Sequence, residues 1–339
     1  MVLAHVTDSW TRSADRHSEP YFTLLFIGGV ASPAFLFLAG VASVMSAASK
    51  ALREGSLRAG ASAARRRGWE IFVLGLVFRL QAEILGLGPL WNLLKVDMLN
   101  TMGLSIVAAM WLWQSSTRRS VRVGLFALAT TAVAAITPLV RATPWLAALP
   151  DPLEAYLRPV GSLAAFPLFP WAGFLFAGIL VGDLVDAVRS HPQRQPLLQS
   201  GIAVSAALGA WLAWQASFRP ALFPTATFWH DSPAFFFIRL GLVALTIPAA
   251  WLAERALSAN ILAPMVTLGR SSLFVYWIHV EMVYGVVAGP LKQALPIWGS
   301  LAGTFLLCLL LYLLVLLKNR WVQEHGLPGR LRILAPVMR

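Results

Sequence analysis

Residues 298–317 read WGSLAGTFLLCLLLYLLVLL, a run of twenty residues without one charged side chain. A helix of about 20 apolar residues crosses the roughly 30 Å hydrocarbon core of a bilayer. Because lipid offers the backbone no hydrogen-bond partners, a spanning segment must satisfy its own amides and carbonyls, as a helix does. This stretch therefore predicts a transmembrane helix. Similar apolar stretches recur along the rest of the chain.

The composition extends that prediction to all 339 residues. Hydrophobic residues make up 58% of the chain and charged residues 12%, and the mean hydropathy is +0.69. An ordinary soluble domain carries about 25% charged residues. The chain therefore has too little polar surface to cover a globule that faces water.

Apolar blocks of spanning length recur along the chain, and MVLAHVTDSW at residues 1–10 is too short to cross a bilayer alone. We expect an all-α, polytopic membrane helical bundle of about ten transmembrane helices, the first one truncated at the N-terminus. It would form a single membrane-embedded domain over residues 1–339. The complete spans are expected near residues 22–48, 69–87, 98–114, 123–140, 166–188, 199–218, 234–253, 264–285 and 298–317.

The net charge of +12 is distributed between the spans. Lys and Arg are retained on the cytoplasmic side of membrane proteins. They gather in the loop Lys50–Arg67, around 118–122, and after residue 317, where Arg330, Arg332 and Arg339 follow. This pattern predicts two cytoplasmic termini and outer loops at 141–165 and 219–233. It does not form the continuous basic stripe typical of nucleic-acid binding, so no nucleic-acid partner is expected.

Several classes of chemistry lack their sequence signals. The single cysteine, Cys308, lies within an apolar run, so we expect neither a disulfide framework nor a cysteine-based metal site. The chain has no GxxxxGK[ST], HExxH, CxxC or GxSxG element. ATP hydrolysis, zinc peptidase chemistry and serine hydrolase chemistry are therefore not expected, and neither is a metal cofactor.

Ionisable side chains inside a span are costly and usually face a partner or a cavity. Arg79 and Glu83 stand four residues apart and could form a purely structural pair. Arg239 must either pair with a carboxylate on another helix or bind an anionic ligand. Together these groups predict a polar pocket that opens outward. Its candidate substrate-binding residues are Arg79, Glu83, Asp97, Asn100, Arg239 and Glu281.

Two histidines are candidates for catalysis. His279 lies in LGRSSLFVYWIHVEMVYG, on a helix with an aromatic face, where many histidines are only structural. His5 is followed one turn later by Asp8, which could orient its ring. Histidine is well suited to take a proton from a hydroxyl or amine near neutral pH. His5, Asp8 and His279 are therefore the predicted catalytic residues.

Two charged features near the cytoplasmic ends have simpler interpretations. Asp183 and Asp186 end a span and are expected to be solvated. The basic loop Lys50–Arg67 could attract a polyanionic ligand such as a nucleotide-bearing thioester, although cytoplasmic retention of positive charge explains it equally.

Six stretches in order carry a family resemblance: MVLAHVTDSW, VASPAFLFLAGVAS, ARRRGWEIFVLGLVFR, VDMLNTMGLS, FPLFPWAGFLFAGILVG and LGRSSLFVYWIH. Over roughly residues 1–285 the chain resembles bacterial members of the heparan-α-glucosaminide N-acetyltransferase catalytic-domain family. The wider acyltransferase 3 families share the same plan of a first-span histidine and about ten helices.

The resemblance implies an enzyme of the bacterial inner membrane. It would transfer an acyl group, typically acetyl from cytoplasmic acetyl-CoA, to a sugar amine or hydroxyl on the outer side. The implied partners are acyl-CoA, a glycan or amino-sugar acceptor and the bilayer, and a homo-oligomer is an open alternative. His5 and His279 match histidines of the family. The loop TRSADRHSEPYF departs from its pattern, so His17 is a second candidate for the base.

The implied mechanism has His5 as general base, steered by Asp8, while Arg79 or Arg239 stabilises the oxyanion of the thioester. His279 would bind substrate or act as a second acid. A covalent acyl-histidine is equally allowed. The rival hypothesis is a transporter or flippase for a sugar or lipid-linked precursor, and a membrane scaffold without chemistry is a third.

Overall fold

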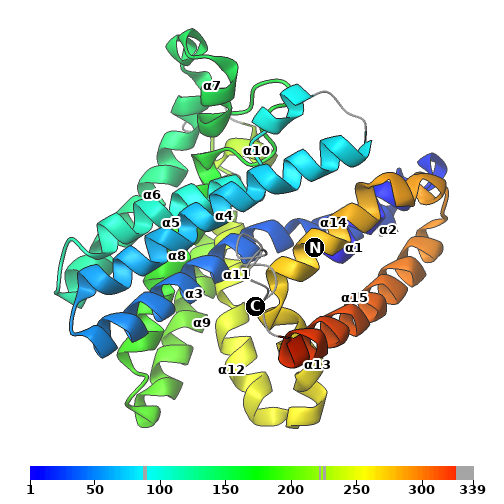
Figure 1. The fold of residues 1–339 in the computed structure, drawn as a ribbon. Helices are drawn as coiled ribbons and strands as arrows, with labels where there is room; N and C mark the ends of the chain where they lie inside the picture. Colours follow the sequence, from blue (N-terminus) through cyan, green and yellow to red (C-terminus); the bar gives the residue numbers. More distant parts are fainter. Residues whose placement is uncertain (87–89, 221–222, 224–226, 326–339) are drawn as a thin grey trace. The chain divides into compact units, whose positions relative to one another are not determined.

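The computed structural model describes residues 1–86, 90–220, 223 and 227–325 (Figure 1). Within these ranges the regular elements are helices, and the only extended pairings are isolated bridges, Thr11 with Leu295 and Val96 with Ala164. The expected all-α class is confirmed. Residue 87 of the second expected span, part of the outer loop 219–233, and Arg330, Arg332 and Arg339 lie outside the described residues.

The helices form two compact units. The first comprises Met1–Ser32, Val77–Leu93 and Ala253–Arg339, and the second comprises Pro33–Leu76 and Leu94–Leu252. Three helices begin in one unit and end in the other: α3 (Ala31–Glu54), α4 (Leu57–Gly86) and α12 (Thr246–Ala256). Each unit is described below by itself.

The first unit contains the two ends of the chain's helical part. Besides the second half of α4, its elements are α1 (Val2–Trp10), η1 (Ser13–Asp15), α2 (Glu19–Gly29), α13 (Ala259–Arg270), α14 (Ser272–Tyr284), η5 (Val286–Leu291) and α15 (Ile297–His325). The short helix η2 (Leu90–Leu94) crosses the boundary between the units.

The second unit contains the remaining helices. They are α5 (Met98–Trp113), α6 (Arg119–Ala142), η3 (Pro144–Ala148), α7 (Asp151–Leu157), α8 (Leu168–Ala187), η4 (Pro192–Arg194), α9 (Gln195–Ser217), α10 (Phe228–Asp231) and α11 (Pro233–Ala244).

Six described helical segments are long and apolar enough to cross a membrane: Glu19–Glu54, Arg119–Ala142, Leu168–Ala187, Pro192–Ser217, Pro233–Ala256 and Ile297–His325. They correspond to six of the expected spans. The span expected at 264–285 is instead a broken pair, α13 and α14, bent by 76°. The span expected at 98–114 is the shorter α5, with 16 residues. A count of about ten spans therefore remains a prediction.

The span expected near 69–87 lies in α4, which is not among the six. This helix has 30 residues, but its first half carries Arg58, Arg65, Arg66 and Arg67. Charged side chains cost several kcal/mol at the centre of a bilayer, roughly 2.5–3.5 kcal/mol each on insertion scales. Only the second half of α4 has the composition of a membrane helix.

Small residues bring α3 and α8 into close contact in the second unit. Gly178 and Gly182 face α3, where a Cβ on Gly178 would collide with the backbone of Phe37 and one on Gly182 with Val44. Gly40 of α3 meets the backbone of Leu175 in the same way. Close approach of two backbones at such residues is typical of membrane helices. Gly178 and Gly182 are therefore packing residues between α3 and α8.

An apolar cluster positions α1 in the first unit. Its buried members are Val6, Trp10, Val283, Leu307 and Leu311, which come from α1, α14 and α15. The end of α1 is also fixed by polar contacts. Ser9 Oγ donates to the carbonyl of Val283 at 3.0 Å, and the amide of Leu295 donates to the carbonyl of Trp10 at 2.9 Å. These contacts hold the end of α1 against α14 and against the segment that precedes α15.

Candidate functional site

The packing of α1 on α14 brings the two predicted histidines into direct contact. His5 Nδ1 lies 3.0 Å from His279 Nε2, a hydrogen-bond distance. The two rings are nearly parallel, with centroids 5.1 Å apart and planes inclined by 13°. His279 is only 1% exposed, whereas His5 is partly buried. The more accessible ring of the pair therefore belongs to α1.

The hydrogen bonds assign the protons of a neutral pair. His279 Nδ1 lies 2.7 Å from the carbonyl oxygen of Val275, one turn earlier on α14. A carbonyl only accepts, so Nδ1 of His279 carries the hydrogen and its Nε2 is an acceptor when the ring is neutral. His5 Nδ1 must then donate to it. The second nitrogen of His5, Nε2, then carries a lone pair that no described residue uses, which makes it the candidate basic atom.

Tyr284 completes the surroundings of His5. Its ring stands edge-on to the His5 ring, with centroids 5.3 Å apart, and its hydroxyl donates to Asp8 Oδ2 at 3.0 Å. The main-chain carbonyl of Asp8 accepts a hydrogen bond from Arg16. In place of the expected direct steering of His5 by Asp8, the ring of His5 is held by His279. Asp8 holds Tyr284, which packs on His5.

His17, the alternative base, lies elsewhere in the first unit. It is exposed, in the turn between η1 and α2. No described side chain orients its ring, and it has no hydrogen bond among the described residues. Among the described residues, a ring held by hydrogen bonding to another side chain is therefore found at His5, whereas the ring of His17 is exposed.

The other predicted residues of the first unit lie on α4 and α14. Glu83 Oε2 accepts a hydrogen bond of 3.0 Å from Asn92, and Arg79 is half-buried on the same helix. Trp277 of α14 donates to Gln81 at 2.9 Å, which fastens α14 to this part of α4. Glu281 is half-buried, and its Oε1 is a buried atom with no hydrogen-bond partner among the described residues. Glu281 therefore keeps an acceptor free.

Asp97 and Asn100 lie in the second unit, where both are buried and cap α5. The side chain of Asp97 accepts from the amide of Met98 at 2.7 Å, and the amide of Asp97 donates to Asn100 Oδ1 at 3.2 Å. Asn100 Nδ2 also donates to the carbonyl of Phe72 at 3.1 Å. Such reciprocal caps satisfy the free amides at a helix start. This local role accounts for both residues, and substrate binding by them stays a prediction.

Arg239, also in the second unit, is surrounded by aromatic rings. Its guanidinium carbon lies 5.3 Å from the ring centre of Trp171, 5.8 Å from that of Phe174 and 5.1 Å from that of Phe235. A cation over aromatic faces is stabilised by the ring quadrupoles. The prediction from sequence gave Arg239 either a carboxylate partner or an anionic ligand, and it did not include these aromatic rings.

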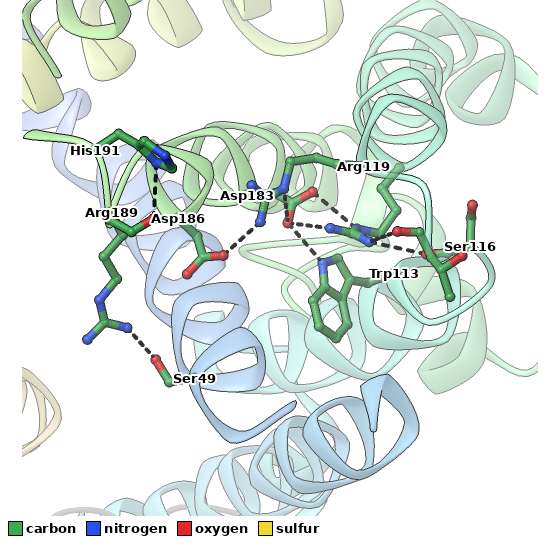
Figure 2. A network of polar contacts seen from close by, with 11 residues as sticks. Ser49, Trp113, Ser116, Arg119, Asp183, Asp186, Arg189 and His191 are labelled. Carbon is green, nitrogen blue, oxygen red and sulfur yellow. Dashed lines mark hydrogen bonds and ion pairs between the residues drawn. The ribbon is translucent and has the colours of Figure 1, made fainter. Parts of the chain in front are cut away.

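A network of arginines and aspartates in the second unit was also missed (Figure 2). Arg122 of α6 donates from Nε and Nη2 to both oxygens of Asp183 on α8, at 3.1 and 3.0 Å. Trp113 Nε1 donates to the same carboxylate at 3.4 Å, and Arg119 Nη2 donates to Asp186 Oδ2 at 2.8 Å. The expectation that Asp183 is solvated was wrong, because it is 1% exposed and paired.

A signal for this network is present in the sequence. Arg119 and Arg122 are three residues apart at the start of one span, and Asp183 and Asp186 are three residues apart at the end of another. Residues three apart share a helix face. Two such pairs of opposite charge at one end of a bundle are typical of an ion-pair network.

Comparison with known proteins identifies a family. The family model described as "Heparan-alpha-glucosaminide N-acetyltransferase, catalytic" matches residues 1–211. The matched part includes His5, Arg79 and the network, whereas Arg239 and His279 lie beyond it. No curated protein and no solved structure matches the chain.

Proposed function

Because the chain belongs to the heparan-alpha-glucosaminide N-acetyltransferase catalytic family, we propose that it is a membrane acetyltransferase. It takes the acetyl group from acetyl-CoA and transfers it to the amine or hydroxyl of a sugar. The observation that carries the proposal is the hydrogen-bonded pair of His5 and His279, which leaves Nε2 of His5 as a free base.

The proposed step uses that nitrogen. Nε2 of His5 removes the proton of the acceptor amine or hydroxyl while the acceptor atom attacks the thioester carbonyl. The carbon–sulfur bond then breaks, the acetyl group stays on the acceptor, and the proton passes from His5 to the leaving thiolate. His279 is a positioning residue here. Its Nε2 accepts the Nδ1–H of His5 and stabilises the imidazolium that forms.

Two further roles follow the family resemblance. Arg79, on the part of α4 that Trp277 of α14 contacts through Gln81, is the candidate donor to the thioester oxyanion. In a two-step route, His5 Nε2 attacks the thioester carbonyl, the carbon–sulfur bond breaks, and coenzyme A leaves as a thiolate that takes a proton from water. The sugar amine or hydroxyl then attacks the acetyl-imidazole, the acyl–nitrogen bond breaks, and the acceptor's proton passes to the released Nε2. We also propose that the donor binds from the cytoplasm and that the acceptor is outside, as the alternation of basic loops predicts.

The test is transfer of labelled acetyl from acetyl-CoA to a panel of amino sugars by purified protein. We expect His5→Ala to lower the rate by about 10²–10⁴-fold, the range typical of a lost general base. His17→Ala is the matched control, because it removes a histidine of the same unit, and it should keep the parent rate. The reverse result, with activity lost only in His17→Ala, would move the base to His17.

One observation favours a second candidate function, transport of a sugar or a lipid-linked precursor. The pair α13 and α14 is bent by 76° at Ser271, and broken helices are a feature of the substrate sites of transporters. Saturable binding of acetyl-CoA separates the two functions. A carrier of a sugar precursor has no use for it, whereas the proposed enzyme requires it.

A further inference from the structure

The arginine network of the second unit borders a cavity of about 960 Å³. The cavity lies where α3 ends, α4 and α6 begin and α8 ends, and its polar wall includes Ser49, Arg53, Arg119, Arg122, Asp186 and Arg189. Figure 2 shows most of these groups, with Arg189 reaching Ser49 and Arg119 reaching Asp186. Sites for small molecules commonly have volumes of about 300–1,000 Å³. The cavity is therefore large enough for an organic ligand.

The ion pairs leave an excess of positive charge in this cavity. Arg122 is neutralised by Asp183 in a buried bidentate pair, with side chains 5% and 1% exposed. Arg119 is paired with Asp186 at 2.8 Å. Arg189 donates to the neutral hydroxyl of Ser49 at 2.8 Å, and Arg53 makes no ion pair with a described residue. Two guanidinium groups thus face the cavity without a carboxylate.

The start of α4 adds to the same potential. Gly55, Ser56 and Leu57 line the cavity, and Gly55 adopts a φ of +63° in the turn from α3 to α4. This turn directs the start of a 30-residue helix toward the cavity wall. The amides at a helix start and the helix dipole both favour an anion.

We propose that this cavity binds the phosphate groups of an anionic ligand, with Arg53 and Arg189 as the main contacts and Arg119 supporting them. Guanidinium is the side chain best matched to phosphate, because its parallel N–H groups meet two phosphate oxygens. Two unpaired arginines suit a ligand with at least two negative charges. The buried pair of Arg122 and Asp183 holds the wall in place and makes no contact with the ligand.

Two sources could supply the phosphates. One is the nucleotide part of the acyl-CoA donor, and this source rests on the proposed function. The other is the headgroup of an anionic lipid, which does not depend on that function.

The test is a binding measurement with two probes on the purified full chain. Adenosine 3′,5′-bisphosphate is titrated by calorimetry, and retention of phosphatidylglycerol is measured by native mass spectrometry. The test variant is the double substitution Arg53→Gln with Arg189→Gln. The control is Arg194→Gln, which removes an exposed arginine of η4 that does not line the cavity.

We expect the double variant to bind one probe about a hundredfold more weakly, since two charged contacts are lost and each is worth roughly a factor of ten. The control should bind as the parent does. The probe that is affected identifies the source. Equal binding by parent and double variant, or binding of neither probe by the parent, would overturn the proposal.

This outcome is separable from the fate of the proposed function. Protein with His5→Ala should bind the phosphate probe as the parent does, because His5 does not line the cavity. Acetyl transfer without binding of either probe would contradict the proposed phosphate site and support the proposed enzyme activity. Binding of a phosphate probe without acetyl transfer would support the phosphate site and contradict the proposed activity.

Discussion

The histidine pair of the first unit and the arginine–aspartate network of the second both hold polar groups away from solvent, but they differ in how completely those groups are used. Arg122 and Asp183 meet through two hydrogen bonds, and Arg122 Nη1 also donates to the carbonyls of Ser116 and Thr117. In the histidine pair, the bond to Val275 places a proton on Nδ1 of His279, and the bond between the rings then places one on Nδ1 of His5. Nε2 of His5 makes no hydrogen bond with a described residue.

This difference separates a structural cluster from a reactive one. A buried charge whose hydrogen bonds are all made within the protein fixes helices in place. Two neutral, hydrogen-bonded imidazole rings leave one nitrogen with a lone pair, and that nitrogen can act as a base. The same contrast applies within the second unit, where Arg122 is paired with a carboxylate whereas Arg53 and Arg189 make no ion pair with a described residue.

The largest effect is expected for the buried ion pair of Arg122 and Asp183. Asp183→Ala leaves Arg122 charged and buried without its carboxylate, which should destabilise the protein by about 3–5 kcal/mol. Thermal unfolding in detergent measures the change. The double substitution Arg122→Met with Asp183→Leu removes both charges and should cost much less. If Asp183→Ala unfolds at the parent temperature, the pair is not structural and the contrast fails.

A smaller effect, on activity, is expected for the buried histidine. His279→Ala removes the acceptor that orients His5, and a misplaced catalytic group costs about 10²-fold in rate. His279→Gln offers a replacement acceptor and should recover part of the rate. The acetyl-transfer assay, together with the pH dependence of the rate, distinguishes positioning from folding. Full activity in His279→Ala would show that the pair is only structural.

The smallest effect concerns the loop that joins α1 to α2. The amide of Ile297 donates to Asp15 Oδ2 at 2.9 Å, and this bond, with a smaller part from Arg12, holds the pKa of Asp15 below its usual value of 3.8. A carboxyl group whose pKa is lower in the folded state stabilises the fold above about pH 4. This stabilisation is lost as the pH falls through the folded-state pKa. Unfolding temperatures at pH 6 and pH 3 should therefore differ more for the parent than for Asp15→Asn. An equal pH dependence in both proteins would exclude the contribution of Asp15.

The class of the fold could be predicted from the sequence because uncharged runs of spanning length leave no other choice in lipid. The number of spans could not. In α4 a basic half and an apolar half form one helix, and in the pair α13 and α14 a bend at Ser271 divides one apolar run. Both depend on how helices pack, which periodicity and composition do not report.

The candidate site was predicted in part. His5 and His279 were chosen as ionisable groups within apolar segments, but they are 274 residues apart in the chain, and only the packing of α1 on α14 shows that they touch. The role given to Asp8 stays a prediction. Its carboxylate accepts a hydrogen bond from the hydroxyl of Tyr284 on a distant helix, a contact that the sequence does not show. The spacing of Arg119, Arg122, Asp183 and Asp186, by contrast, was visible in the sequence and could have been used.

The most direct test of the central claim is chemical rescue of the missing base. Acetyl transfer to the sugar acceptor is measured with His5→Ala protein, with and without added imidazole, beside the parent and His17→Ala. We predict that His5→Ala alone transfers acetyl about 10²–10⁴-fold more slowly than the parent and regains part of the rate as imidazole is added, because the diffusing ring replaces the lost Nε2. Transfer by His5→Ala at the parent rate without imidazole would contradict the claim that the histidine pair is the reacting site.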